Sequence, residues 1–159
     1  MSEQGKKHYK PSNNKHGLLI FVLLLLVSNI FLFYFDWQSS HAKGLTFAML
    51  NVGQGDALFI ESPDGTQVLV DAGPPRKVLG QLARVMSPFD RHIDAVFITN
   101  PDADHIGGLQ DVLKNYKVDA VFEPGTSNSS KTYQNLGRDI KNKNILNLKT
   151  SKGMRLNIG

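Results

Sequence analysis

One long apolar run dominates the hydrophobic pattern near the amino terminus. Residues Leu18 to Phe35 contain no charged side chain, and Ser28 and Asn29 are their only polar interruptions. At about 1.5 Å per residue, a helix of this length spans about 27 Å, close to the roughly 30 Å hydrocarbon core of a bilayer. The run is apolar on every side, unlike the one-sided pattern of a helix packed on a soluble core. It predicts a membrane-inserted helix over residues 18–37, after a basic tail at 1–17.

The flanks of this segment leave two interpretations open. Four lysines precede it, and the positive-inside rule keeps them cytoplasmic, which places the rest of the chain outside. The segment is either an uncleaved anchor or a secretory signal cleaved near Ala42, because Ser40-His41-Ala42 resembles a small-x-small site. An apolar run longer than the usual ~7–15 residues favours the anchor. We therefore predict a single-pass membrane protein with an extracytoplasmic soluble domain, and a secreted protein as the alternative.

Beyond a predicted linker at 38–43, residues 44–159 change to short alternating elements. Strand-like runs come first, and strands then alternate with segments whose apolar residues have helical spacing. The predicted strands are Leu45–Val52, Asp56–Glu61, Gln67–Val70, Asp94–Thr99, Val118–Phe122, Ile145–Leu148 and Met154–Ile158. The predicted helices are Lys77–Met86, Gly108–Tyr116 and Ser129–Lys143, with Ser129 or Ser130 as the cap of the last. This order predicts an α/β domain in which helices cover sheets.

Composition and charge restrict the chemistry that the chain can perform. The 159 residues include no cysteine, which excludes disulfide-linked partners, thiolate metal sites and a cysteine nucleophile. The net charge of +4 is uneven, since residues 124–159 hold seven Lys or Arg against Asp139 alone. Such a stretch is compatible with nucleic acid or an anionic surface as a partner, and equally with the solvated face of an ordinary fold.

A group of potential metal ligands follows the fourth predicted strand. Asp102, Asp104 and His105 lie close together in the sequence, just before Gly107 and Gly108. Carboxylate oxygens and imidazole nitrogens bind zinc, manganese and iron, so this stretch is a candidate metal-binding loop. The alternative is a polar strand-to-helix turn with Asp102 or Asp104 as an N-cap. In either case the two glycines are expected to permit the turn and to contact nothing.

Four pieces of the chain together resemble one family. They are Asn51-Val52-Gly53-Gln54-Gly55-Asp56, Val68-Leu69-Val70-Asp71-Ala72-Gly73, the strand that leads into 100–105, and Ile106-Gly107-Gly108-Leu109. In this order and spacing, residues 45–125 resemble the amino-terminal half of a metallo-β-lactamase-fold hydrolase domain. Within that superfamily they are most similar to the extracellular domain of the ComEC/Rec2 competence proteins and their stand-alone relatives. The resemblance implies a four-layer αββα sandwich with a metal centre at the sheet edge.

The resemblance also implies roles for individual residues. The family motif His-x-His-x-Asp-His falls on residues 100–105, which makes Asp102, Asp104 and His105 the implied metal ligands. Asp104 would also orient the catalytic water, and Asp71 would be the buried carboxylate that orients the loop. Asn100 stands where the family has His, and its amide oxygen is a weaker ligand. The implied cofactor is one or two divalent ions, with zinc expected and manganese as the alternative.

Two functions follow as hypotheses. The first is a membrane-anchored, metal-dependent hydrolase of the competence type that acts on DNA phosphodiesters through metal-activated water. The second is a non-catalytic DNA-binding or DNA-uptake accessory module that keeps the fold with a degraded metal site. The family's remaining ligands, a later His and a bridging Asp, would lie further along, and no His follows His105. The sequence is therefore expected to be either a truncated enzyme or a remnant without catalysis.

Overall fold

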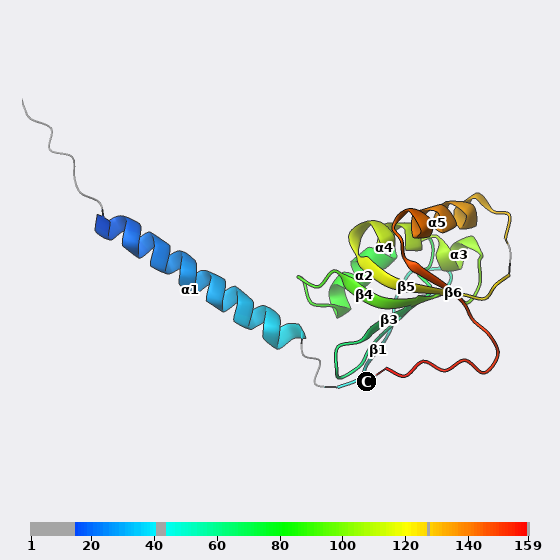
Figure 1. The fold of residues 1–159 in the computed structure, drawn as a ribbon, viewed down its shortest axis with the longest axis horizontal. Coiled ribbons are helices and arrows are strands. Elements are labelled where there is room, and N and C mark those ends of the chain that lie inside the picture. The colour runs from blue at the N-terminus through cyan, green and yellow to red at the C-terminus, as the bar shows by residue number, and fades with distance from the viewer. Residues whose placement is uncertain (1–14, 41–43, 127, 159) are drawn as a thin grey trace, which may run out of the picture. The chain divides into compact units, whose positions relative to one another are not determined.

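The computed structural model describes residues 15–40, 44–126 and 128–158 (Figure 1). The chain divides into two compact units, Met1–Trp37 and Gln38–Gly159. Most of the predicted basic tail lies outside the described residues, and so do residues 41–43 of the predicted linker.

The apolar run near the amino terminus forms one continuous helix, α1 (Lys15–Ser40). The helix is longer at both ends than the predicted segment, so residues 38–40 are helical rather than part of a linker. Ser28 Oγ and Asn29 Nδ2 both donate to the carbonyl oxygen of Leu25, at 2.9 and 2.8 Å. These bonds pair the two polar side chains within the helix, as an apolar environment requires. By length and composition, α1 could span a membrane, a test that a signal sequence also passes.

The second unit is built on a six-stranded sheet whose spatial order follows the chain, β1 to β6. Its strands are β1 (Thr46–Met49), β2 (Leu58–Glu61), β3 (Gln67–Val70), β4 (His92–Phe97), β5 (Lys117–Glu123) and β6 (Leu146–Lys149). The first three pair antiparallel, and β3 to β6 pair parallel. Because parallel neighbours need crossover connections, helices occupy the later links of the chain. These are α2 (Val78–Val85), α3 (Ala103–Ile106), α4 (Leu109–Asn115) and α5 (Lys131–Asn142).

The helices α2 to α5 cover one face of this sheet (Figure 1). Their apolar sides, including Leu82, Val112 and Leu136, form a single buried core with alternate strand residues such as Leu69 and Val96. The described part of the second unit therefore has one sheet and one helical layer, which is the mixed α/β arrangement expected for one half of the implied sandwich.

The opposite face of the sheet carries apolar side chains outside that core. Phe47 and Met49 on β1 are exposed, at 63% and 72%. The rings of Phe97 and Phe122, on adjacent strands, stack with centroids 4.4 Å apart. Residues 150–156 run beside this stacked pair and enclose with it a hollow of about 260 Å³.

Two local expectations from the sequence are wrong. Met154–Ile158 forms no strand, because the chain turns at Gly153 (φ +89°) and Met154 lies against the hollow beside Phe97 and Phe122 instead of pairing with β6. Residues 103–106, expected as a turn, form the short helix α3. The remaining predicted strands and helices are confirmed, with shifted ends in every case except Gln67–Val70.

Candidate metal centre

Three chain segments meet where β3 and β4 end. They are residues 50–57, 71–75 and 99–108, and backbone hydrogen bonds join them. The Ala72 N–H donates to the His105 carbonyl at 2.8 Å, and the Gly73 N–H donates to the Asp56 carbonyl at 2.9 Å. The Gly108 N–H in turn donates to the Gly73 carbonyl at 2.9 Å. The polar side chains of these segments are therefore carried on a frame that the backbone itself holds together.

Two glycines allow this close approach. A Cβ on Gly55 would lie 1.8 Å from the Asp104 carbonyl oxygen, and one on Gly108 would lie 2.3 Å from the Ala72 carbonyl oxygen. The expectation that Gly107 and Gly108 contact nothing is wrong, since a Cβ on Gly107 would also lie 2.6 Å from Pro75 Cδ. Gly108 has φ −77°, which any residue adopts, so packing against Ala72 explains the glycine there.

Asp71 occupies the centre of the frame, directly after β3. It is 1% exposed and has φ +55°, a left-handed conformation uncommon for residues other than glycine. Its own N–H donates to the Phe97 carbonyl at 2.8 Å, which holds the backbone there. Its carboxylate accepts the Thr99 N–H at 2.8 Å and also the Thr99 hydroxyl. The strained position thus aims a fully buried carboxylate at the loop beyond β4.

The remaining contact of this carboxylate is with His105. Asp71 Oδ2 lies 2.9 Å from His105 Nδ1. The hydrogen bond to Asp71 raises the pKa of His105, the charges of Asp71, Asp104 and Asp56 add to the rise, and partial burial opposes it. With Nδ1 engaged by Asp71, the ring offers Nε2 to another group. This is the arrangement in which a carboxylate orients a histidine for metal binding.

Asp102 is placed differently from His105. It holds the N-cap position of α3 without making a side-chain capping bond. Its carboxylate instead accepts amide hydrogens from Asn100, at 3.0 Å, and from Asn128, at 3.4 Å. Asn128 also donates to the Pro101 carbonyl at 3.3 Å. Asp102 is therefore engaged by two side-chain amides that tie the loop to the chain before α5.

Asp104 and His105 are neighbours on the helical turn of α3, where consecutive side chains point about 100° apart. The structure therefore does not gather Asp102, Asp104 and His105 into one compact set. Among the described residues, the group of three His or carboxylate side chains with ligand atoms all within 4.8 Å of one another lies elsewhere. Within those residues, no hydrogen bond or ion pair engages the Asp104 carboxylate, which is half-buried beside His105.

These side chains suit a divalent cation at one position. His105 presents an oriented imidazole, which is a suitable nitrogen donor. The Asp104 carboxylate beside it is a suitable oxygen donor. Asp102 would have to give up its amide partners to join them. Asn100 donates its amide N–H to Asp102 and contributes no imidazole. His105 and Asp104 are thus the stronger donors at this centre, and Asn100 and Asp102 are the weaker ones.

Sequence patterns did not identify every residue that builds this centre. Thr99 was assigned only as the end of a strand, yet it holds both oxygens of Asp71. Asn128 lies 26 positions from Asp102, too far for a local pattern to connect them. Gly55 has φ +77°, but its contact with Asp104 depends on the tertiary fold and no local pattern shows it.

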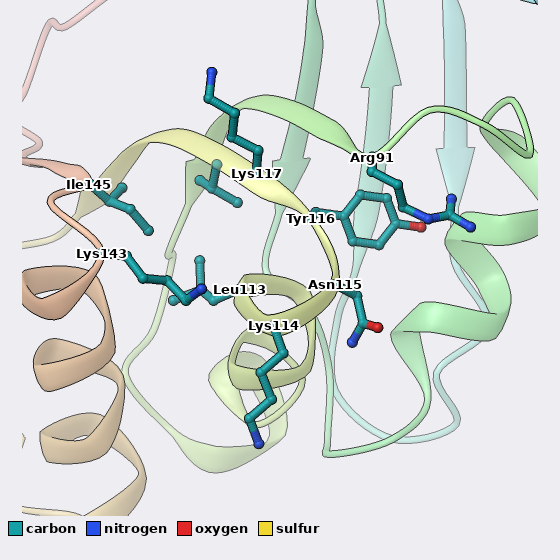
Figure 2. A pocket seen from close by; sticks show the side chains of 9 residues that line it. Arg91, Leu113, Lys114, Asn115, Tyr116, Lys117, Lys143 and Ile145 are labelled. Atoms are coloured by element: carbon teal, nitrogen blue, oxygen red, sulfur yellow. The ribbon is translucent and has the colours of Figure 1, made fainter.

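A separate hollow of about 500 Å³ lies at the opposite ends of the strands (Figure 2). Its floor includes Leu113 and Tyr116. Four cationic residues from different elements are among those that line it, and none of its lining residues is acidic. These are Arg91 before β4, Lys114 on α4, Lys117 on β5 and Lys143 after α5. Arg91 also lies over the Tyr116 ring, 5.5 Å from its centroid.

Comparisons with known proteins point to one family. The model of the metallo-beta-lactamase superfamily matches residues 50–133, which include all three segments of the candidate centre. ComE operon protein 3 of Bacillus subtilis (strain 168) is 33% identical, over 48% of this chain and 12% of that protein. Hydroxyacylglutathione hydrolase of Xylella fastidiosa (strain M12) is 28% identical, over 55% of this chain and 32% of that enzyme. The chain thus spans less than a third of the length of either relative.

Solved structures show similarity at a lower level. A subclass B3 metallo-beta-lactamase, MEM-A1, from a soil metagenome library has 19% identity and a TM-score of 0.42, covering 51% of this chain and 31% of that one. A diphosphatase of the PhnP family has 24% identity and a TM-score of 0.38, covering 60% of this chain and 36% of that one. Because the family model matches more than half of the chain and includes Asp71, Asp104 and His105, the protein belongs to the metallo-beta-lactamase superfamily.

Proposed function

We propose that the protein is a membrane-anchored, metal-dependent hydrolase whose soluble domain acts on DNA phosphodiesters outside the cytoplasm. The superfamily supports the hydrolase class, and the similarity to ComE operon protein 3 supports the link to competence. The apolar helix α1 supports membrane attachment. Zinc is the proposed metal, with manganese as the alternative, because the available donors are one imidazole and carboxylates.

The observation that carries this proposal is the bond between the buried Asp71 carboxylate and His105 Nδ1 at 2.9 Å. A buried charge is costly unless hydrogen bonds satisfy it, and Asp71 has them from Thr99 and His105. A surface turn has no need of such an arrangement. The hydrogen bond to Asp71 fixes the orientation of the His105 ring and leaves Nε2 as the nitrogen available to a metal ion.

In the proposed reaction, residues of this chain would hold the metal ion, orient the water and accept its proton. A divalent ion lowers the pKa of water and offsets the charge of a phosphodiester when it is bound. His105 and Asp104 would hold it. Asp71 keeps the imidazole in one orientation, and the Asp104 carboxylate orients the water and takes up its proton. Thr99 fixes Asp71 in turn.

The test compares the full-length protein in detergent with an Asp104→Ala/His105→Ala variant. We expect the unmodified protein to bind zinc at this centre and to hydrolyse bis-p-nitrophenyl phosphate and single-stranded DNA. We expect the variant to lose the hydrolysis and the zinc bound at this centre. Asp111→Ala is the matched control, because Asp111 is a nearby carboxylate that accepts the Arg76 N–H at 2.8 Å and takes no part in the centre. Hydrolysis that survives the double substitution would contradict the proposal.

A second candidate function is a non-catalytic DNA-binding or DNA-uptake accessory module. The observations that favour it are the Asn100 amide in place of an imidazole and the cationic hollow of Figure 2. Phosphate contacts by Lys and Arg give binding that weakens steeply with salt. If this function is the correct one, Lys114→Ala/Lys143→Ala reduces salt-sensitive DNA binding, while the unmodified protein shows no metal-dependent hydrolysis.

A further inference from the structure

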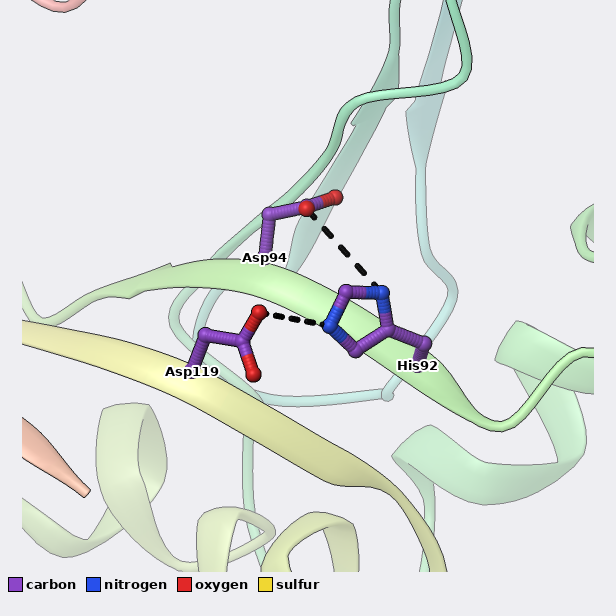
Figure 3. A group of neighbouring side chains, drawn as sticks. All are labelled: His92, Asp94 and Asp119. Carbon is purple, nitrogen blue, oxygen red and sulfur yellow. Dashed lines mark hydrogen bonds and ion pairs between the residues drawn. The ribbon is translucent and has the colours of Figure 1, made fainter.

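A histidine and two carboxylates lie together on the sheet, away from the loops described above. His92 is the first residue of β4, Asp94 follows on the same strand, and Asp119 lies on the adjacent strand β5. Figure 3 shows the imidazole between the two carboxylates. One ring nitrogen, Nε2, is 2.8 Å from Asp119 Oδ2, and the other, Nδ1, is 3.9 Å from Asp94 Oδ1. One ligand atom from each of the three residues lies within 4.8 Å of the other two.

We propose that His92, Asp94 and Asp119 form a second binding site for a divalent transition-metal ion. Zinc bonds of about 2.0–2.2 Å to nitrogen and oxygen place two ligands of one ion roughly 3–4 Å apart. The three ligand atoms, which lie within 4.8 Å of one another, would have to close to this spacing by side-chain rotation when an ion binds. A mixed set of one imidazole and two carboxylates suits zinc and other borderline metals better than calcium or magnesium, which prefer oxygen alone.

The positions of these ligands are set by the sheet. In the parallel register, Ile93 lies opposite Val118, and both belong to the core under the helices. Because successive strand residues point to opposite faces, His92, Asp94 and Asp119 point away from the helices. The Gln67 N–H on β3 donates to Asp94 Oδ2 at 2.7 Å, which fixes this carboxylate and leaves Oδ1 toward the ring. A rigid scaffold thus presents all three groups on one face.

The cluster is open to solvent and close to charge balance. The side chains of His92, Asp94 and Asp119 are 39%, 37% and 46% exposed, so water can complete the coordination of an ion. Lys117 Nζ lies 2.9 Å from Asp119 Oδ1, and its own side chain is 76% exposed. Asp119 thus has one oxygen engaged by Lys117 and the other facing the His92 ring.

The ion pair between Lys117 and Asp119 makes the proposal testable by substitution of Lys117. An exposed pair between an ammonium and a carboxylate is worth only about 0–1 kcal/mol, so Lys117 can move aside at small cost. Its charge nevertheless competes with a cation for Asp119. A cluster that serves only as a hydrogen-bond network is weakened when Lys117 is removed, whereas a metal site is strengthened. A metal site therefore predicts that Lys117→Gln raises the zinc affinity of the cluster, whereas a hydrogen-bond network predicts no zinc binding there for the substitution to change.

The experiment is a calorimetric zinc titration of the full-length protein in detergent, in an Asp104→Ala/His105→Ala background. This background removes the loop ligands, so the outcome does not depend on the proposed function. We expect the background to bind a single zinc equivalent. Adding His92→Asn abolishes this binding, adding Asp119→Asn weakens it, and adding Lys117→Gln tightens it. An imidazole ¹⁵N resonance of His92 shifts on zinc addition.

Two results would overturn the site. One is a background protein that binds no zinc. The other is zinc binding that His92→Asn and Asp119→Asn leave unchanged, which would assign it to another part of the chain. Thermal unfolding of each variant, measured without metal, shows whether the fold is retained, and the Lys117→Gln variant keeps the test decisive if a ligand substitution destabilises the sheet.

Discussion

At the scale of single residues, the candidate centre depends on the carboxylate of Asp71. It is buried, its backbone has positive φ, and its two oxygens serve Thr99 and His105. This combination places a negative charge against one side of an imidazole and leaves the other side for a ligand. The orientation of His105 therefore originates at the end of β3, on a different strand from the loop that carries the histidine.

Replacing this carboxylate by an amide tests that dependence. Asp71→Asn weakens the hydrogen bond to His105 and removes the charge behind it, both of which raise the pKa of His105, so we expect that pKa to fall toward its ordinary value of 6.5. Zinc affinity should fall about 10–100-fold, the usual cost of losing a ligand's orienting partner. NMR titration of the imidazole gives the pKa, and calorimetry gives the affinity. Asp56→Asn is the control, because Asp56 is 71% exposed and 4.0 Å from the ring. Equal effects of the two substitutions would contradict the assignment.

The pKa of His105 also affects how the stability of the metal-free protein depends on pH. A histidine whose pKa is raised on folding stabilises the folded state fully below its unfolded pKa, and this contribution is lost as pH rises through the folded pKa. The free energy of unfolding should therefore decline above about pH 6.5 in the unmodified protein, and less so in Asp71→Asn. Zinc binds the neutral ring, so zinc affinity should change in the opposite direction and rise with pH. Urea unfolding at a series of pH values measures the first effect.

At the scale of elements, close backbone contacts hold the loops in place. The turn at residues 51–56 approaches α3 so closely that Gly55 has no room for a side chain, while Gly53 in the same turn has nothing within 4 Å of its Cβ position. Both have positive φ, +77° and +88°. Substitutions at the two glycines therefore separate the free-energy cost of a side chain at positive φ from the cost of a steric contact.

This pair gives a matched prediction for stability. Gly53→Ala should cost about 1–2 kcal/mol, the penalty for a side chain in the left-handed region. Gly55→Ala should cost that amount and a further ~1–3 kcal/mol, because the new methyl meets the Asp104 carbonyl. It should also weaken zinc binding, since α3 has to shift. Urea unfolding measures both costs, and equal losses for the two variants would show that the turn does not press on α3.

The start of α5 supplies a second prediction at this scale. The sequence left Ser129 or Ser130 as its cap, and the structure selects Ser130, whose Oγ accepts the Tyr133 N–H at 3.2 Å. Ser130→Ala should destabilise the domain by about 1 kcal/mol, the usual cost of losing an N-cap. Ser129→Ala should have little effect on stability. A larger loss from Ser129→Ala, measured by thermal unfolding, would reverse this assignment.

The elements themselves were largely predictable from the sequence, since periodicity, turn residues and caps are local. The strand Gln67–Val70 is placed as expected, and helices α2, α4 and α5 differ from expectation only at their ends. Contacts between distant segments were not predictable. The α3 turn depends on its fit between Gly55 and Ala72, and the Asn128 bond to Asp102 depends on where α5 lies. Residues 154–158 alternate like a strand but pack on the sheet face instead.

At the scale of the whole molecule, the chain joins an apolar helix to a domain of the metallo-beta-lactamase superfamily. The uncleaved anchor predicts that the protein stays in the membrane fraction through an alkaline carbonate wash and that its intact mass includes residues 1–42. A cleaved signal predicts a soluble protein whose mass begins after Ala42. Mass spectrometry of the protein recovered from both the membrane fraction and the soluble fraction distinguishes them. A mature chain that starts beyond Ala42 would contradict the anchor and favour secretion.

The central claim is that His105, oriented by Asp71, binds a divalent ion through Nε2. The most direct measurement is ¹⁵N NMR of the imidazole nitrogens of the full-length protein in detergent during addition of zinc. The account predicts that the His105 Nε2 resonance shifts to a zinc-bound value while Nδ1 keeps its hydrogen bond to Asp71. A His105 ring that remains unperturbed at saturating zinc would contradict it.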